Sequence, residues 1–159
     1  MPEGPEVRRY GIDLAAASSQ KILENISVLS GRYAKKCIPG MSELNSRLPV
    51  KVTGVGVHGK FLYWILKNDF YIWNTLGMTG HWSPEKRKHS RVEFRFADGS
   101  CVYYNDQRNF GTLKFVRGRH SLLKKLESLG PDMLASDVHD RVFVERIRSK
   151  PKWTIVKAL

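Results

Sequence analysis

Hydrophobic residues near the start of the chain recur at steps of three and four positions, the spacing of one helix face. They are Val7, Tyr10, Leu14 and Ala17. Pro5 suits the first turn of such a helix, where its missing N–H removes no hydrogen bond. The pattern therefore predicts one N-terminal helix that ends near Ser18.

After this helix the pattern changes to short runs rich in β-branched and aromatic residues, which favour strands. These runs are 22–29, 50–57, 60–67, 70–76, 91–97, 101–105 and 112–116. The run 91–97 alternates cleanly between apolar and charged residues, and we expect hairpin turns at Asp98-Gly99 and at 67–69. Short strands joined by tight turns predict a mainly β fold with helices, an antiparallel β-sandwich with an N-terminal helix.

Helical patterns return towards the end of the sequence, at 121–130 and 136–150. Gly130-Pro131 is a typical helix end. We therefore assign the β-sandwich to residues 1–131 and the start of a helical second domain to residues 132–159. A last apolar run stops with the sequence, so we expect this second domain to be truncated.

The composition is that of an ordinary soluble globular protein, with 42% hydrophobic and 26% charged residues among 159. No apolar stretch is long enough to span a membrane, and the start lacks the pattern of a secretory signal. Cys37 and Cys101 are isolated, and the histidines lack the spacing of a metal site. We expect an intracellular protein with no membrane partner, no metal ligands and no cofactor.

The charge is strongly positive, with 27 basic and 15 acidic residues and a formal net charge of +12. From Leu76 onward there are 17 basic and 9 acidic residues, so most of the surplus lies in the second half. Basic residues cluster at 85–91, 117–120 and 146–152. Such a surplus favours a polyanionic partner, above all nucleic acid, although a basic protein without a dedicated partner is the alternative.

The first residues, MPEGPEVRRY, suggest chemistry at the chain terminus. If Met1 is removed, Pro2 presents a secondary amine, and an α-amino group is partly neutral and nucleophilic near pH 7. Attack on the anomeric carbon of a sugar gives an iminium ion, an electron sink that favours elimination at the neighbouring carbon. Glu3 could act as general acid or base, with Glu6 on the same helix face. The alternative is that acidic residues in a first helical turn only complement the helix dipole.

Lys60 follows a glycine at the predicted start of a strand, where it could contact phosphate or transfer a proton, or could be merely a solvated lysine. Two glycine-bearing loops, 74–80 and 105–111, carry large side chains at their tips. These side chains are Met78, Arg108 and Phe110. They would suit a protein that extrudes a base from a duplex and fills the gap, unless Met78 and Phe110 are core residues and Arg108 pairs with Asp106.

Six segments occur in the order found in one known family. They are MPEGPEVRR, HGKFLYW, LGMTG, KHSRVEF, DQRNFG and LGPDML. Over essentially its whole length the chain resembles the N-terminal catalytic domain of the formamidopyrimidine-DNA glycosylase/endonuclease VIII family. The opening is more similar to the endonuclease VIII branch and DQRNFG to the formamidopyrimidine branch. GKFL, YIWNT and RNFGT are also similar to segments of the Nei-like proteins of giant DNA viruses.

The resemblance implies a bifunctional DNA glycosylase and AP lyase of base-excision repair, a monomer that acts on oxidised bases in damaged DNA, with pyrimidines favoured. It implies Pro2 as the nucleophile that forms the Schiff base, Glu3 as the acid on the opening sugar, and Glu6 as its support. It implies that Lys60 contacts phosphates and assists β,δ-elimination. By the same resemblance the residues that bind DNA are Met78, His89, Arg108 and Phe110.

The sequence departs from the family in one respect. The helix-two-turn-helix and the four-cysteine zinc finger of the family's second domain are not matched, so no metal is carried over. A DNA-binding module without catalysis therefore remains an alternative. A third reading, an N-terminal proline acting as general base on small keto acids, leaves the basic clusters and the two loops unexplained.

Overall fold

Antiparallel strands form the body of the protein in the computed structural model, which describes residues 1–135, 140–149 and 151–154. Within these residues the strands form one eight-stranded sheet in the order β5-β7-β6-β1-β2-β3-β4-β8. Their bounds are β1 Ile22–Val28, β2 Val50–His58, β3 Phe61–Leu66, β4 Phe70–Thr75, β5 His81–Ser83, β6 Ser90–Phe96, β7 Cys101–Asn105 and β8 Thr112–Arg117.

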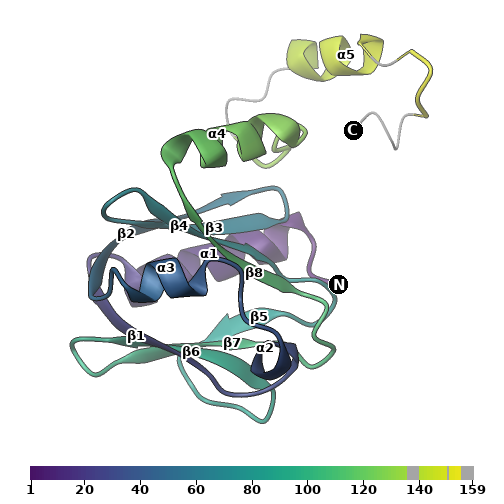
Figure 1. Ribbon diagram of the computed structural model, residues 1–159. Coiled ribbons are helices and arrows are strands. Elements are labelled where there is room, and N and C mark those ends of the chain that lie inside the picture. Colours follow the sequence, from purple (N-terminus) through teal and green to yellow (C-terminus); the bar gives the residue numbers. More distant parts are fainter. Residues whose placement is uncertain (136–139, 150, 155–159) are drawn as a thin grey trace.

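The sheet folds into two layers at the junction of β1 and β2. These two strands share only two residue pairs, Ile22 with Lys51 and Leu23 with Val50, whereas β3 and β4 pair along their whole length. One layer consists of β5, β7, β6 and β1, and the other of β2, β3, β4 and β8 (Figure 1). Every pairing is antiparallel. The predicted antiparallel β-sandwich is therefore confirmed.

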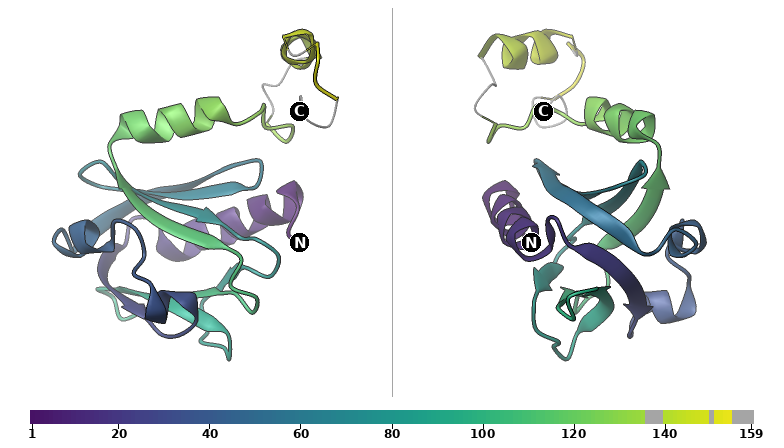
Figure 2. Two further views of the ribbon diagram at one scale, coloured as in Figure 1. Left: turned by 45° about the vertical axis from the view of Figure 1, so that its right-hand side comes forward. Right: turned by 90° about the vertical axis from the view of Figure 1, so that its left-hand side faces the viewer.

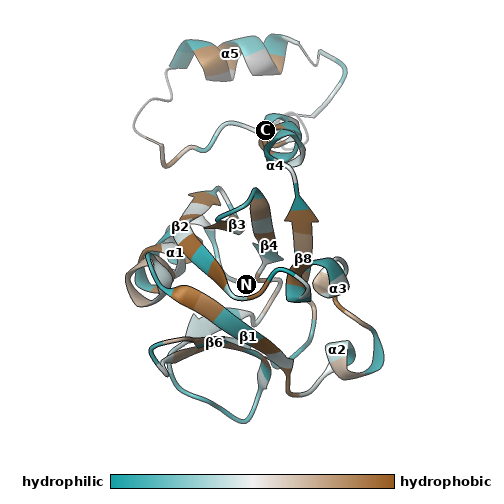
Figure 3. Cartoon of the chain, turned by 60° about the vertical axis from the view of Figure 1, so that its left-hand side comes forward, coloured by the Kyte–Doolittle hydropathy of each residue, from teal (hydrophilic) through white to brown (hydrophobic). Residues whose placement is uncertain are grey.

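The core fills the space between the two layers, and hydrophobic residues recur along the strands that enclose it (Figure 3). The fully buried Trp64 of β3 lies at its centre. Its ring centroid is 5.3 Å from that of Phe94 in the opposite layer and 5.2 Å from that of Trp82. Aromatic packing across the layers thus holds the sandwich together.

Helices close the two open sides of the sandwich (Figure 2). Helix α1 (Gly4–Ser18) contacts strands of both layers and buries Val7 and Leu14. It approaches β2 closely, because a Cβ at Gly11 would lie 2.3 Å from the Val57 side chain. On the opposite side lie the short helices α2 (Arg32–Lys35) and α3 (Met41–Asn45).

The last two helices follow β8. Helix α4 (Arg119–Ser128) covers the outer face of the β2-β3-β4-β8 layer, where Leu122 packs with Phe61 and Tyr71. Helix α5 (Asp140–Arg148) follows further along the chain. No helix in the described part of the chain is long and apolar enough to cross a membrane.

The predicted elements match the observed ones with small shifts. Helix α4 begins and ends two residues earlier than the predicted 121–130, and α5 falls within the predicted 136–150, of which residues 136–139 and 150 lie outside the described residues. Lys60 was expected in a strand but lies in the turn before β3. Strand β5 and helices α2 and α3 were not predicted.

Candidate functional site

The first turn of α1 fixes the geometry of the chain start. Glu3 immediately precedes the helix, and its carbonyl accepts a hydrogen bond of 2.9 Å from the Val7 N–H. The Glu3 N–H donates to Oε2 of Glu6 at 2.9 Å. The bond to Glu6 holds its carboxylate against the backbone of Glu3, next to Pro2.

Lys60 reaches this terminus from the turn between β2 and β3. Gly59 occupies the left-handed region with φ of +57°, which permits the tight turn. The Nζ atom of Lys60 lies 2.6 Å from Oε2 of Glu3, in an ion pair whose side chains are 49% and 58% exposed. The structure therefore brings the candidate catalytic residues Glu3, Glu6 and Lys60 together beside Pro2.

Two cavities meet at Pro2. The larger, of about 900 Å³, is bordered by Pro2 and Lys60 and extends along the ends of β3, β4 and β8 to α2 and α4. The smaller, of about 250 Å³, is bordered by Pro2, Glu6 and Met78. A nucleophile at Pro2 would thus have open space on both sides, with a carboxylate on one side and an ammonium on the other.

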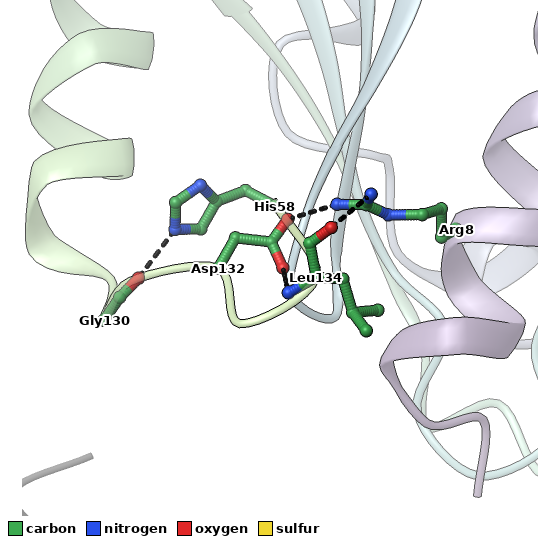
Figure 4. A network of polar contacts seen from close by, with 5 residues as sticks. All are labelled: Arg8, His58, Gly130, Asp132 and Leu134. Carbon is green, nitrogen blue, oxygen red and sulfur yellow. Dashed lines mark hydrogen bonds and ion pairs between the residues drawn. The ribbon is translucent and has the colours of Figure 1, made fainter. Parts of the chain in front are cut away.

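A polar network adjoins the turn that carries Lys60, because Asp132 contacts Gly59. Figure 4 shows the residues of this network. The buried Asp132 carboxylate accepts a hydrogen bond of 2.9 Å from Arg8 on α1 and one of 3.1 Å from the Leu134 N–H. Arg8 also donates to the Leu134 carbonyl at 2.7 Å. His58 Nε2 donates to the Gly130 carbonyl at 2.7 Å. Segment 130–134 is thereby tied both to α1 and to the end of β2.

The charge of Asp132 is part of this network. Burial by itself raises the pKa of its carboxyl group, but hydrogen bonds from the Leu134 and Gly59 amides and from Arg8 outweigh it, so the pKa lies below its ordinary value. Because Asp132 contacts Gly59, it helps to position the neighbouring Lys60. Sequence reasoning missed these supporting residues, although the LGPDML segment contained Asp132.

The two glycine-bearing loops form one unit at the opposite edge of the smaller cavity. The buried Asp106 carboxylate accepts a hydrogen bond of 2.5 Å from the Thr79 hydroxyl and one of 2.8 Å from the Gly111 N–H. The Arg108 N–H in turn donates to Thr79 Oγ1 at 3.0 Å. Asp106 therefore joins the loops through Thr79 and Gly111, rather than pairing with the side chain of Arg108.

The large side chains at the loop tips project outward. Met78 is 40% exposed and Phe110 is 62% exposed, so neither is the core residue that the alternative reading supposed. Arg108 is also exposed. Exposed apolar side chains beside a cation are what insertion into a duplex requires.

His89 joins the same unit through its backbone. Its carbonyl accepts a hydrogen bond of 3.0 Å from the Asp106 N–H, and its side chain is half-buried in the basic loop before β6. Arg91 then clamps the loop 106–111, because its guanidinium donates to the carbonyls of Asp106 at 2.7 Å and Gln107 at 3.2 Å. Sequence reasoning did not predict this role of Arg91, although the residue lies in the basic cluster 85–91 and in the KHSRVEF segment.

The described residues include no group of three or more His, Cys, Asp or Glu side chains that could hold a metal ion. Cys37 and Cys101 are both free thiols. The residues that converge at the terminus are suited to acid, base and nucleophilic chemistry that their own side chains carry.

Comparison with known proteins connects this geometry to a family. The family model for the formamidopyrimidine-DNA glycosylase N-terminal domain matches residues 1–113. The formamidopyrimidine-DNA glycosylase of Lactobacillus gasseri is 29% identical over 159 residues, covering 96% of this chain and 56% of the relative. That of Exiguobacterium sibiricum is 35% identical over 122 residues, covering 72% and 42%.

Solved structures share the fold. The crystal structure of MutM (Fpg) from Thermus thermophilus superposes with a TM-score of 0.73 at 26% identity, covering 93% of this chain and 52% of that one. Lactococcus lactis Fpg, non-covalently bound to DNA containing an AP site, gives 0.76 at 24% identity, with coverages of 93% and 58%. The chain spans about half the length of the relatives it matches.

Proposed function

The chain belongs to the formamidopyrimidine-DNA glycosylase/endonuclease VIII family, and we propose that it carries the catalytic half of a bifunctional DNA glycosylase and AP lyase. The substrate is an oxidised base in DNA, with pyrimidines favoured, and the enzyme acts as an intracellular monomer. Residues 1–131 supply the chemistry, and residues 132–159 begin a helical DNA-binding domain. The observation that carries this proposal is the 2.6 Å ion pair of Glu3 and Lys60 beside Pro2.

The glycosylase step begins once Met1 has been removed. The free Pro2 nitrogen attacks C1′ of the damaged nucleotide, the C1′–N bond breaks, and the base leaves with the proton that the Pro2 nitrogen gives up. Glu3 donates a proton to the sugar-ring oxygen as the ring opens, and the product is an iminium ion between Pro2 and C1′. Glu6, which borders the smaller cavity with Pro2, supports the terminus from the helix side.

The lyase step uses the same iminium ion. Its positive charge makes the C2′ proton acidic, and loss of that proton expels the 3′ phosphate by β-elimination. A second elimination then expels the 5′ phosphate. Lys60 contacts the phosphates and assists the proton transfer, and its position in the turn next to Glu3 places it at the mouth of the larger cavity.

The joined loops serve to hold the duplex open. Met78, Arg108 and Phe110 enter the space that the extruded nucleotide leaves, and His89 contacts a phosphate. Support comes from the exposure of Met78 and Phe110 and from the hydrogen bonds that fix both loops to Asp106. The net charge of +12 suits a DNA partner.

Borohydride trapping tests the proposal. Protein whose Met1 has been removed, as verified by mass spectrometry, is incubated with DNA containing an abasic site and sodium borohydride. We expect a covalent adduct that maps to the N-terminal peptide and is absent from Pro2→Thr. Protein that retains Met1 is the matched control and should form no adduct. An adduct through Lys60, or none at all, would contradict the roles assigned here.

The basic surface alone would also suit a DNA-binding module without catalysis. That function predicts salt-sensitive DNA binding that is indifferent to lesions and unchanged in Pro2→Thr. The same protein preparations distinguish the two functions, because only the enzyme forms the adduct and cuts the strand.

A further inference from the structure

The larger cavity extends beyond Pro2 and Lys60 to aromatic rings that the proposed chemistry does not use. Phe61 begins β3 and Trp73 lies near the end of β4, and both line the cavity. Their ring centroids are 5.7 Å apart in an edge-to-face arrangement. Phe61 is buried and Trp73 is only partly buried, so at this end of the sheet Trp73 offers a flat apolar surface near the proposed nucleophile.

The same cavity is lined by cations, of which Lys60 is paired with Glu3 outside the lining. Its charged lining residues are Arg32, Lys36, Lys60, Lys114 and Lys125, and no Asp or Glu occurs among the described residues that line it. Two of the cations lie over the rings. Lys114 Nζ is 5.5 Å from the centroid of Trp73, and Lys125 Nζ is 5.7 Å from that of Phe61. The cavity is therefore built for a ligand that is both flat and anionic.

We propose that this aromatic–cationic groove (Phe61, Trp73, Lys114 and Lys125) binds one unpaired nucleotide of the DNA strand, with its base against Trp73 and its phosphate on the two lysines. Rings for stacking and cations for the backbone are the combination by which proteins hold single-stranded nucleic acid. A volume of about 900 Å³ is sufficient for a nucleotide. The inference rests on the proposed function, because the strand it names is the one that Pro2 attacks.

Lys114 contributes to both parts of such a site, the aromatic surface for the base and the cations for the phosphate. It lies directly opposite Trp73 in the pairing of β4 with β8, and its side chain is exposed. In the free protein its ammonium occupies the space over the indole ring. An arriving base takes that space, and the displaced ammonium moves to the phosphate of the same nucleotide.

An acidic peptide is the other ligand class that such cations could bind. It would use Lys114 and Lys125 but would leave the flat surface of Trp73 and Phe61 without a function. The adjacent position of Pro2 and Lys60, which the proposed chemistry directs at a sugar-phosphate backbone, favours the nucleotide.

The experiment compares two fluorescent oligomers of equal length and charge. One is a single-stranded thymidine decamer, and the other is the same sugar-phosphate chain without bases. We expect the full chain to bind the decamer at least about fivefold more tightly, the lower end of what one base–aromatic stack contributes. Trp73→Leu should abolish this preference and Trp73→Phe should keep most of it. Tyr63→Leu, on the same sheet face but outside the cavity lining, should leave it unchanged.

The lysines are tested in the same assay. Lys114→Gln and Lys125→Gln should weaken binding of both oligomers by similar factors, because they act on the backbone. Lys124→Gln is the matched control, since this exposed residue of α4 does not line the cavity. Quenching of indole fluorescence by the decamer, present in the wild type and diminished in Trp73→Phe, provides a readout that does not depend on how Trp73→Leu folds.

Three results would overturn the inference. They are equal affinity for the two oligomers, an unchanged preference in Trp73→Leu, and a decaglutamate peptide that binds as tightly as the thymidine decamer. Failure of the proposed function is separate, because it would appear as a wild-type protein that forms no borohydride adduct. Trp73→Leu should still form that adduct with saturating abasic DNA.

Discussion

Two half-exposed side chains, Glu3 and Lys60, form the ion pair on which the proposed chemistry depends. An exposed pair of this kind contributes only about 0–1 kcal/mol to stability. Two backbone features create it, the capped start of α1 and the left-handed turn at Gly59. Because the pair adds little stability, we propose that it serves as a positioned acid and base rather than as a structural contact.

Replacing Glu3 distinguishes a catalytic role of the ion pair from a structural one. We expect Glu3→Gln to slow base excision by about 10²–10⁴-fold, the usual contribution of a general acid. The free energy of unfolding should change by less than about 1 kcal/mol, because the pair is exposed. Single-turnover excision of an oxidised pyrimidine and urea unfolding measure the two effects. Glu24→Gln, an exposed carboxylate on β1, should change neither, and normal excision by Glu3→Gln would refute the role.

Asp132 gives a prediction with a pH dependence. Its folded pKa is lowered, so its stabilisation is complete above the unfolded pKa of about 3.9 and is lost as the pH falls through the folded value. Asp132→Asn should therefore cost about 1–3 kcal/mol of unfolding free energy at pH 7 and much less at pH 3. Urea unfolding at both pH values measures the difference. Asp13→Asn, an exposed carboxylate on α1, is the control, and a cost independent of pH would contradict the assignment.

At the scale of elements, each of the two glycine-bearing loops, 74–80 and 105–111, has a base that hydrogen bonds hold in place and a tip that is exposed. Asp106 is 1% exposed and receives hydrogen bonds from both loops, whereas Phe110 at a tip is 62% exposed. Gly77 must also remain glycine, since its φ is +61° and a Cβ would lie 2.6 Å from the Gly111 nitrogen. Hydrogen bonds thus hold the loops at the base, which supports the proposal that their exposed tips contact DNA.

This division predicts different consequences for two substitutions. Asp106→Ala should reduce both stability, by about 1–3 kcal/mol, and excision from duplex DNA, because it leaves buried donors without an acceptor. Phe110→Ala should reduce excision from duplex DNA with little change in stability. Thermal unfolding and excision assays measure both, with Leu123→Ala as the control for an exposed apolar side chain. Wild-type stability of Asp106→Ala would show that the loops are not joined through it.

Most elements could be predicted because their patterns are local. Short runs of β-branched and aromatic residues predicted seven of the eight strands in the described residues, and the turn at 67–69 is confirmed by positive φ at Asn68 and Asp69. Strand β5 has only three residues, and α2 and α3 have four and five, too few for a periodic pattern. Tertiary contacts define these short elements, so local sequence does not reveal them.

The residues of the candidate site were proposed from the sequence, but the residues that support them were not. Terminal chemistry, the glycine before Lys60 and the family resemblance suggested Pro2, Glu3, Glu6 and Lys60, and only the fold shows that they lie close together. Arg8 and Asp132 are separated by 124 residues, and Trp73 meets Lys114 only through the register of β4 and β8. Contacts across such separations depend on strand order, which hydrophobic pattern does not determine.

At the scale of the whole molecule, positive charge is concentrated where the proposed function requires it. The larger cavity carries five cations and, in its described lining, no carboxylate, and the loop before β6 adds a further basic cluster at 85–91. The relatives that the chain matches are about twice as long as it is. The charge of this chain should by itself suffice for measurable, salt-dependent DNA binding.

Salt dependence can locate the DNA on this surface. The slope of log K against log salt concentration should become less steep by about 0.9 for each phosphate contact that is removed. Lys88→Gln, beside His89, should therefore reduce the slope by about one and weaken binding of damaged and undamaged DNA equally. Lys67→Gln, an exposed lysine in the turn at the other end of β3 and β4, is the matched control and should leave the slope unchanged. A slope that is unchanged in Lys88→Gln and reduced in Lys67→Gln would contradict this prediction. It would place the duplex at the end of the sandwich opposite to Pro2, where the proposed active site could not reach it.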